Sequence, residues 1–202
     1  MRQKTSQFDR YIVTPKVSKF RFFVFVPQAV LPSNLVIVIG RDDDATFGVL
    51  SSRFHETWSL AQGQWIGVGN DPTYTPSTTF ETFPFPEGLT PNIPATDYAA
   101  DLRAQKIAAA AARLNELREN WLNPADLVVR VPEVVPGYPD RILPKDAAAE
   151  VILKKRTLTN RKRRLRLIDF ASVRSLTWLR ERFLQQTEGW HGEWCRRICP
   201  SA

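Results

Sequence analysis

The chain has 202 residues, 43% of them hydrophobic, and a formal net charge of +7. This length and composition predict one domain, or one domain with an appendage, with enough apolar residues to bury a core. No apolar run reaches the length of about eighteen residues typical of a membrane span, and no apolar stretch follows the charged N-terminus. We therefore expect neither a membrane span nor a secretory signal.

The positive charge is concentrated at the C-terminal end. Residues 154–202 contain 13 Lys and Arg against 4 Asp and Glu, a net charge of +9. Residues 1–153 contain 15 Lys and Arg against 17 Asp and Glu, a net charge of −2. The total of +7 is therefore no evidence for a nucleic-acid surface on the body of the protein.

The N-terminal part of the chain predicts an antiparallel sheet. Four segments have strand-like apolar patterns: residues 11–13, 19–26, 35–39 and 46–50. The second alternates in its apolar positions, as a half-buried strand does. The run at 35–39 is continuously apolar, which is expected of a central strand, and a turn is expected at residues 40–44.

Three later segments predict helices: residues 51–62, 97–122 and 146–158. Ser51 or Ser52 can cap the first helix, and Gly63 can end it. The second has apolar residues at helical spacing and five consecutive alanines, and ends before a proline. Residues 130–144, with four prolines, predict an extended connector. The predicted fold class is α+β: a small antiparallel sheet with a packed helix and a long recognition loop, followed by a helical C-terminal region.

Residues 63–86, GQWIGVGNDPTYTPSTTFETFPFP, here called the central segment, have the composition of a binding surface. Glycines permit close backbone approaches. Amide and hydroxyl side chains can hydrogen-bond to base edges, and aromatic rings can stack on bases or wedge between them. An ordinary long loop is the alternative. The candidate contact residues in this segment are Gln64, Trp65, Asn70, Thr73, Tyr74, Thr75 and Ser77.

For other reactive side chains, the sequence pattern favours structural roles over chemical ones. Residues 42–44 are three consecutive aspartates that could ligate a hard cation. Their place between two strand-like runs favours a turn, where Asp is common. His55 lacks the partners of a catalytic triad, so a structural role or a contact with the DNA backbone is preferred to a general base.

The C-terminal end contains two further weak motifs. His191, Cys195 and Cys199 have spacings wider than those of usual zinc ligands. Because the only two cysteines lie here, we expect no disulfide framework and predict a cytoplasmic location. The basic run at residues 161–166 could bind nucleic acid or form a solvated tail.

Several colinear segments resemble the target recognition domain of MmeI-like adenine-specific DNA methyltransferases, restriction-modification enzymes that join methylation and sequence recognition in one chain. The segments are RYIVTPKVSKFRFFVFV (residues 10–26), RDDDATFGVLSSRFHETWSL (residues 41–60) and NDPTYTPSTTFETFPFPEG (residues 70–88). The helix at 97–122 and VVPGYPDRILPKD (residues 134–146) are similar to the C-terminal region of these enzymes. The resemblance covers about residues 8–160.

The resemblance implies sequence-specific recognition of double-stranded DNA. The strands and the helix at 51–62 would form a platform, and residues 63–80 would enter or lie along a groove. The resemblance also divides the chain into a target recognition domain (1–92), a helical C-terminal region with the Pro-rich connector (93–160) and a non-homologous or frame-shifted basic tail (161–202). The side chains expected at phosphates are Lys16, Lys19, Arg41 and Arg53, and base edges would be read near Trp65, Asn70, Thr73 and Tyr74.

The motifs that would make such an enzyme active are absent from this sequence. It has neither a glycine-containing S-adenosylmethionine site nor the Asn/Asp-Pro-Pro-Tyr/Phe motif that holds a flipped adenine. Residues 70–74, NDPTY, have a single proline, and Pro139-Asp140 is not followed by a nuclease's acidic-x-Lys element. We expect a fragment with no catalytic residue, cofactor or metal of its own, although the full-length family uses S-adenosylmethionine. Two alternatives remain: a protein-interaction module that uses the long helix, and a subunit that a separately encoded catalytic domain completes.

Overall fold

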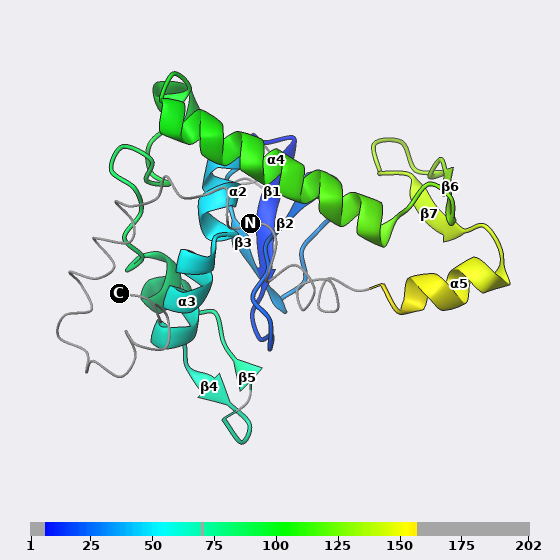
Figure 1. The fold of residues 1–202 in the computed structure, drawn as a ribbon, viewed down its shortest axis with the longest axis horizontal. Coiled ribbons are helices and arrows are strands. Elements are labelled where there is room, and N and C mark those ends of the chain that lie inside the picture. The colour runs from blue at the N-terminus through cyan, green and yellow to red at the C-terminus, as the bar shows by residue number, and fades with distance from the viewer. Residues whose placement is uncertain (1–6, 70, 157–202) are drawn as a thin grey trace, which may run out of the picture.

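A three-stranded antiparallel sheet forms the centre of the computed structural model, which describes residues 7–69 and 71–156 (Figure 1). Its strands are β1 (Arg10–Pro15), β2 (Val24–Pro27) and β3 (Val36–Ile39), in the order β2-β1-β3. The expectation that residues 35–39 form the central strand is wrong. A continuous apolar run is typical of a strand buried on both faces, but β3 is an edge strand in which only Ile39 is fully buried, so the run does not report the number of neighbouring strands. The central strand is β1, where Tyr11, Ile12 and Val13 are all buried.

The expected returning strand at 46–50 is instead a helix, α2 (Asp44–Leu50). The Asp43 side chain accepts a hydrogen bond from the Thr46 N–H at 2.7 Å and so caps its first turn. Phe47, Val49 and Leu50 are all buried. Because a short helix buried on most of its surface is apolar nearly throughout, its sequence pattern cannot be distinguished from that of a buried strand.

The helix predicted at 51–62 is confirmed as α3 (Arg53–Gln62). Ser52 is its N-cap, and its side chain accepts a hydrogen bond from the His55 N–H at 3.2 Å. Gly63 is its C-cap, as expected. The second predicted helix is also present, as α4 (Leu102–Leu122), preceded by the short 3₁₀ helix η2 (Ala95–Tyr98).

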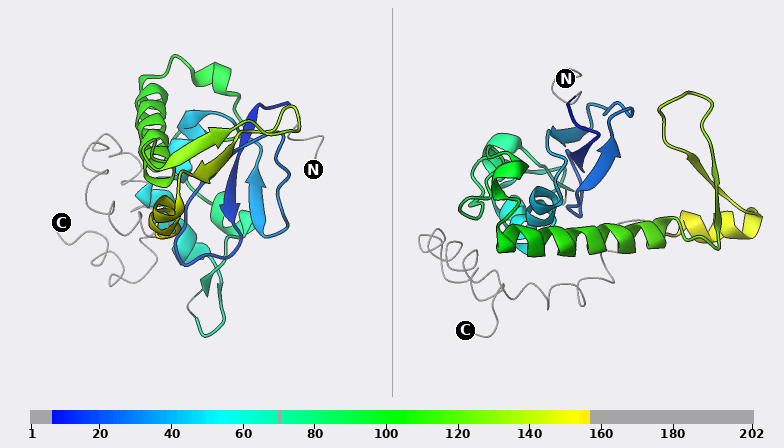
Figure 2. Two further views of the ribbon diagram at one scale, coloured as in Figure 1. Left: turned by 90° about the vertical axis from the view of Figure 1, so that its right-hand side faces the viewer. Right: turned by 90° about the horizontal axis from the view of Figure 1, so that it is seen from above.

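Helix α4 joins the sheet and helices to the C-terminal end of the described chain (Figure 2). Its N-terminal half packs on α2, where Ala111 is buried and Ile107 lies against the core. Further along α4, the Arg118 guanidinium donates a hydrogen bond to the Phe23 carbonyl at 2.7 Å. Within the described residues, no helix combines the length and the apolar character needed to cross a membrane.

Residues 123–156, here called the C-terminal arm, lie at the far end of α4 from the sheet (Figure 2). The extended connector expected at 130–144 is instead a hairpin of β6 (Val128–Val131) and β7 (Arg141–Pro144). The prolines lie in the loop and at the end of β7, where no ladder hydrogen bond is lost, so they are compatible with paired strands. Helix α5 (Ala147–Lys154) follows, within the predicted range of 146–158.

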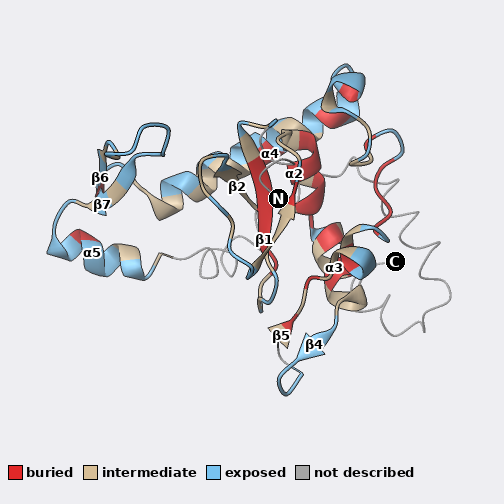
Figure 3. Cartoon of the chain, turned by 180° about the vertical axis from the view of Figure 1, so that it is seen from behind, coloured by how far each residue is buried: buried red, intermediate tan, exposed pale blue. Residues whose placement is uncertain are grey.

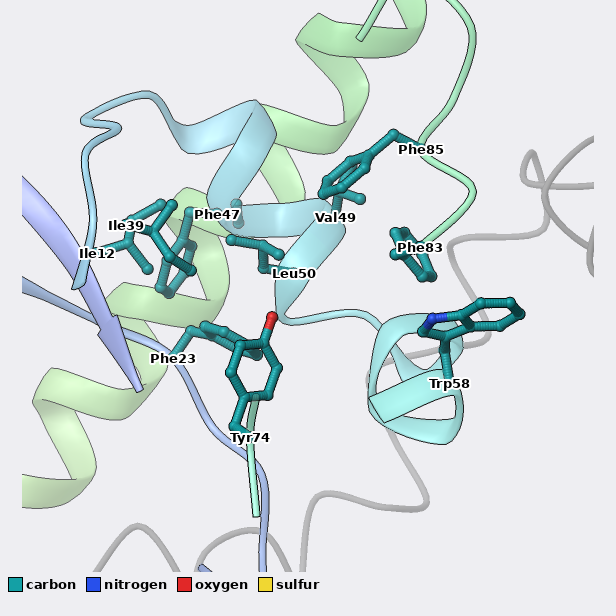
Figure 4. Packing of buried hydrophobic residues seen from close by; sticks show 11 residues of the cluster. Ile12, Phe23, Ile39, Phe47, Val49, Leu50, Trp58, Tyr74, Phe83 and Phe85 are labelled. Atoms are coloured by element: carbon teal, nitrogen blue, oxygen red, sulfur yellow. The ribbon is translucent and has the colours of Figure 1, made fainter. Parts of the chain in front are cut away.

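The core lies between the sheet, α2, α3 and the second half of the central segment (Figures 3 and 4). Its buried members come from every one of these elements: Ile12, Phe23, Ile39, Phe47, Val49, Leu50, Trp58, Tyr74, Phe83, Phe85 and Ala111. This arrangement of small antiparallel sheets and packed helices confirms the predicted α+β fold class.

Candidate nucleic-acid interface

The first half of the central segment is a small hairpin that extends away from the body of the protein (Figure 1). Its strands are β4 (Trp65–Ile66) and β5 (Asp71–Pro72), with Trp65 opposite Pro72 and Ile66 opposite Asp71. Between them, Gly67 and Gly69 have positive φ values of 68° and 83°, a conformation that favours glycine. The hairpin therefore requires glycine on both sides of Val68.

Large apolar side chains of this hairpin are exposed. The exposed fraction is 49% for Trp65, 45% for Ile66 and 95% for Val68. Val17, which forms an isolated β-bridge with Thr73, is also exposed. Exposed apolar groups gathered on one element are typical of a binding site. Of these residues, only Trp65 was predicted from the sequence as a contact residue. The available signal for Ile66 and Val68 was their position between the loop glycines.

The base of the hairpin is joined to the turn that follows β1. The Thr73 N–H donates to the Gln64 carbonyl at 2.8 Å, which closes the hairpin. The Tyr74 N–H donates to the Lys16 carbonyl at 2.7 Å, and the Ser18 N–H donates to the Pro72 carbonyl at 3.2 Å. These bonds bring the exposed residues Lys16 and Lys19 to the hairpin. Sequence positions about fifty residues apart thus form one surface.

Tyr74 belongs to the core and not to this surface. Its exposed fraction is 1%, and its hydroxyl forms a 2.8 Å hydrogen bond with His55 Nε2 (Figure 4 shows the ring of Tyr74 beside Phe23). The Arg21 guanidinium lies 4.9 Å from the centre of the Tyr74 ring. Because the side chain is enclosed, the expectation that Tyr74 contacts bases is not compatible with the structure. Its role is to fix the base of the hairpin to the core.

His55 is fully buried, which agrees with the structural role expected for it and leaves no path to a DNA backbone. Burial, and then the positive charge of Arg21, lower the pKa of His55 to about 3. The imidazole is therefore neutral at physiological pH, with the Tyr74 hydroxyl on Nε2 and no partner for Nδ1 among the described residues. Burial also raises the pKa of Tyr74, so the phenol stays protonated.

The second half of the central segment continues from Tyr74 into a π-helical turn, η1 (Pro76–Phe80). The Thr75 carbonyl accepts hydrogen bonds from the Thr79 N–H and hydroxyl at 2.9 and 2.8 Å. Ser77 is exposed on this turn, whereas Thr75 is half-buried. The following Phe83 meets His55 edge-on, with ring centres 4.5 Å apart. This half is therefore a structural strut with one exposed turn.

Arg41, expected at a phosphate, is used within the fold. Its Nε atom lies 2.8 Å from an Asp43 carboxylate oxygen, and Nη1 donates to the carbonyls of Pro91 and Ile93 at 3.0 and 2.7 Å. A further hydrogen bond runs from Nη2 to the Tyr98 hydroxyl. With its side chain 12% exposed, Arg41 ties the residues before η2 to the start of α2 and has no free face for a phosphate.

Two of the three consecutive aspartates have side-chain partners within the fold, and the Asp42 carbonyl accepts a hydrogen bond from Arg10 Nε at 3.0 Å. Asp43 caps α2 and pairs with Arg41, and Asp44 pairs with Arg10 at 3.1 Å. Burial alone would raise the pKa of Asp43, but hydrogen bonds from the Thr46 N–H, Tyr98 and Arg41 lower it, so the carboxylate is ionised. No group of His, Cys, Asp and Glu in the described part of the chain is arranged to hold a metal ion.

The remaining predicted contact residues divide by exposure. Arg53 is exposed in the first turn of α3, Gln64 is exposed at the start of the hairpin, and Thr73 is half-buried at its end. Asn70, His191, Cys195, Cys199 and the basic run at 161–166 lie outside the described residues. The structure therefore brings together Lys16, Lys19, Gln64, Trp65 and Thr73.

Comparison of the chain with protein-family models, with curated proteins and with solved structures finds no match. The similarity to MmeI-like methyltransferases therefore remains a prediction from the sequence.

Proposed function

We propose that this chain is a module that recognises a specific sequence in double-stranded DNA and that it is part of a restriction-modification DNA methyltransferase without its catalytic domain. The observation that carries the proposal is the β4–β5 hairpin, which is exposed, rich in groups that can contact bases, and fixed at its base to a turn with two lysines. The cytoplasmic location belongs to the same proposal.

In this proposal the two kinds of contact have separate side chains. Lys16 and Lys19, together with Arg53 on α3, bind phosphates and set the position of the module on the duplex. Gln64, Thr73 and Ser77 offer hydrogen-bonding groups to base edges, and Trp65 offers an aromatic face. Arg41 and Tyr74 are excluded because their side chains are enclosed in the fold.

The test is selection of bound duplexes from a random-sequence pool by the purified chain, followed by binding measurements at several salt concentrations. We expect enrichment of one sequence motif. Each phosphate contact contributes about −0.9 to the slope of log K against log salt concentration. The double variant Lys16→Ala/Lys19→Ala should therefore lower the steepness of this slope by about 2.

Exposed cations on α4 provide the matched control. The variant Lys106→Ala/Arg113→Ala removes the same charge from α4, away from the β4–β5 hairpin (Figure 1). We expect this variant to leave the slope of log K against log salt concentration unchanged. No enriched motif, together with binding that salt does not affect, would contradict the proposed function.

A second candidate function is the docking of another protein, such as a separately encoded catalytic domain, on the C-terminal arm. Val129 and Leu143 are cross-strand partners on one face of the β6–β7 hairpin and are 43% and 42% exposed. Val151 and Ile152 on α5 are also exposed. The chain mixed with labelled S-adenosylmethionine and DNA should transfer no methyl group alone. Methyl transfer by the isolated chain would contradict both candidates.

A further inference from the structure

We propose that the tip of the β4–β5 hairpin, residues 66–69, is an apolar wedge that enters a base-pair step of the bound duplex from the minor groove and kinks the DNA. This inference rests on the proposed function, since it assigns a mechanical role within the same DNA complex. It differs from the roles that the sequence suggested for this segment, which were hydrogen bonding to base edges by polar side chains and stacking or wedging by aromatic rings, because here the inserted groups are aliphatic.

The chemistry of the tip supports insertion. Gly67, Val68 and Gly69 offer no side-chain donor or acceptor to a base edge. Val68 is 95% exposed, and an added Cβ at Gly69 would have no atom within 4 Å. Proteins that bind the minor groove use such exposed apolar side chains to separate stacked bases and bend the duplex by about 20–90°. Ile66, at the start of the tip, would fill the opened step.

A wedge must also resist the force of restacking, and the base of this hairpin is built for that. Two backbone hydrogen bonds, from Tyr74 and Ser18, join it to the turn after β1. Pro72 is fully buried, and the buried Tyr74 side chain is held by a hydrogen bond with His55 in the core. A force on the tip therefore acts on the sheet and on α3, to which the base of the hairpin is hydrogen-bonded.

Charge distinguishes this hairpin from the other exposed hairpin of the protein. Lys16 and Lys19 lie at the base of β4–β5, where cations can neutralise the phosphates beside a kink. The β6–β7 hairpin also exposes apolar side chains, with Val134 87% exposed, but its two arginines are paired with carboxylates, Arg130 with Glu119 and Arg141 with Glu133. At the base of β4–β5, Lys16 and Lys19 outnumber the single carboxylate of Asp71, so the local charge favours DNA insertion by β4–β5.

The experiment uses duplexes recovered from the selection described above, with 2-aminopurine placed at successive positions and a donor–acceptor dye pair on the two ends. We expect the full chain to raise 2-aminopurine fluorescence at one step and to shorten the end-to-end distance. The variant Ile66→Ser/Val68→Ser should still bind the duplex but lose both signals. The control variant Val134→Ser, at the other exposed hairpin, should keep both.

The outcomes separate the inference from the function on which it rests. Specific binding without unstacking or bending, or a signal that Ile66→Ser/Val68→Ser leaves unchanged, would overturn the wedge and leave DNA recognition standing. Absence of specific binding by the unaltered chain would overturn both, and the apolar tip would then be a contact for a protein. Equal thermal unfolding of the variants and the unaltered chain would establish that a lost signal is not a loss of folding.

Discussion

The two halves of the central segment both contain aromatic and polar side chains, but they differ in burial. Trp65, in the first half, is 49% exposed, whereas Tyr74, Phe83 and Phe85, in the second, are 1%, 4% and 8% exposed (Figure 3 shows the change along the chain). The second half passes between the sheet and α3, where His55 and Phe23 supply aromatic neighbours. The first half extends beyond both elements. The presence of an aromatic residue alone thus does not tell whether its side chain is exposed.

The boundary between the halves is a set of backbone hydrogen bonds. At Pro72 and Tyr74 the chain is bonded to the turn after β1, and beyond this point Phe83 and Phe85 are buried whereas Ser77 stays exposed. Before this point the Thr73 N–H closes the hairpin by donating to the Gln64 carbonyl. The segment is therefore anchored in the core in its second half and exposed in its first.

The largest expected effect comes from removing an aromatic ring in the buried half. Phe83→Ala should lower the free energy of unfolding by about 3–5 kcal/mol, because it leaves a cavity against His55, Trp58 and Phe85. Trp65→Ala removes a larger ring from the exposed half and should change stability by about 0.5 kcal/mol or less. Urea unfolding of both variants measures the contrast, and equal losses would show that the two halves are not distinct.

A smaller effect concerns the pH dependence of the anchor. Since the pKa of His55 is lowered to about 3 in the folded state, the unfolded chain binds a proton near pH 6.5 that the folded chain does not. The stability that His55 contributes is complete above pH 6.5 and falls with pH below it. Between pH 7 and pH 5 we expect a loss of about 2 kcal/mol.

The variant His55→Gln tests this assignment. Glutamine keeps a hydrogen-bonding group for Tyr74 but does not titrate, so its stability, although lower at pH 7, should change little between pH 7 and pH 5. Urea unfolding at several pH values measures the slope. If the variant retains the slope of the unaltered chain, the anchor is not the pH-sensitive element.

The smallest effect concerns the junction of the hairpin with α3. A Cβ atom at Gly63 would lie 2.6 Å from the carbonyl oxygens of both Ser59 and Thr73. Gly63→Ala should cost about 1–2 kcal/mol, within the range for overpacking, because a backbone oxygen on each side would have to shift. Gly40→Ala, where the Cβ would meet only Phe8 at 3.5 Å, is the control and should be within about 0.5 kcal/mol of the unaltered chain. A loss equal to that of Gly40→Ala would mean that this junction is not tightly packed.

The sequence predicted correctly those helices that are specified by signals within a few residues of their own ends or interior. Ser52 and Gly63 bound α3, and helical spacing with an alanine run specifies α4, because capping and propensity act within a few residues. Two predictions from apolar patterns were wrong, the central position of residues 35–39 and the strand at 46–50. A continuous apolar run looks the same in a half-buried edge strand, a buried central strand and a short buried helix, so it decides neither the element nor its place in the sheet.

For the candidate site, the sequence by itself determined which segment carries unusual chemistry: glycines, amides, hydroxyls and aromatic rings between residues 63 and 86. Only the tertiary structure decided which of those side chains face outward. Tyr74 and Arg41 find partners from other elements, such as His55 on α3 and Asp43 before α2, and are therefore enclosed. Trp65, Ile66 and Val68 meet no such partners in the described part of the chain, because two glycines and two-residue strands hold them clear of the core.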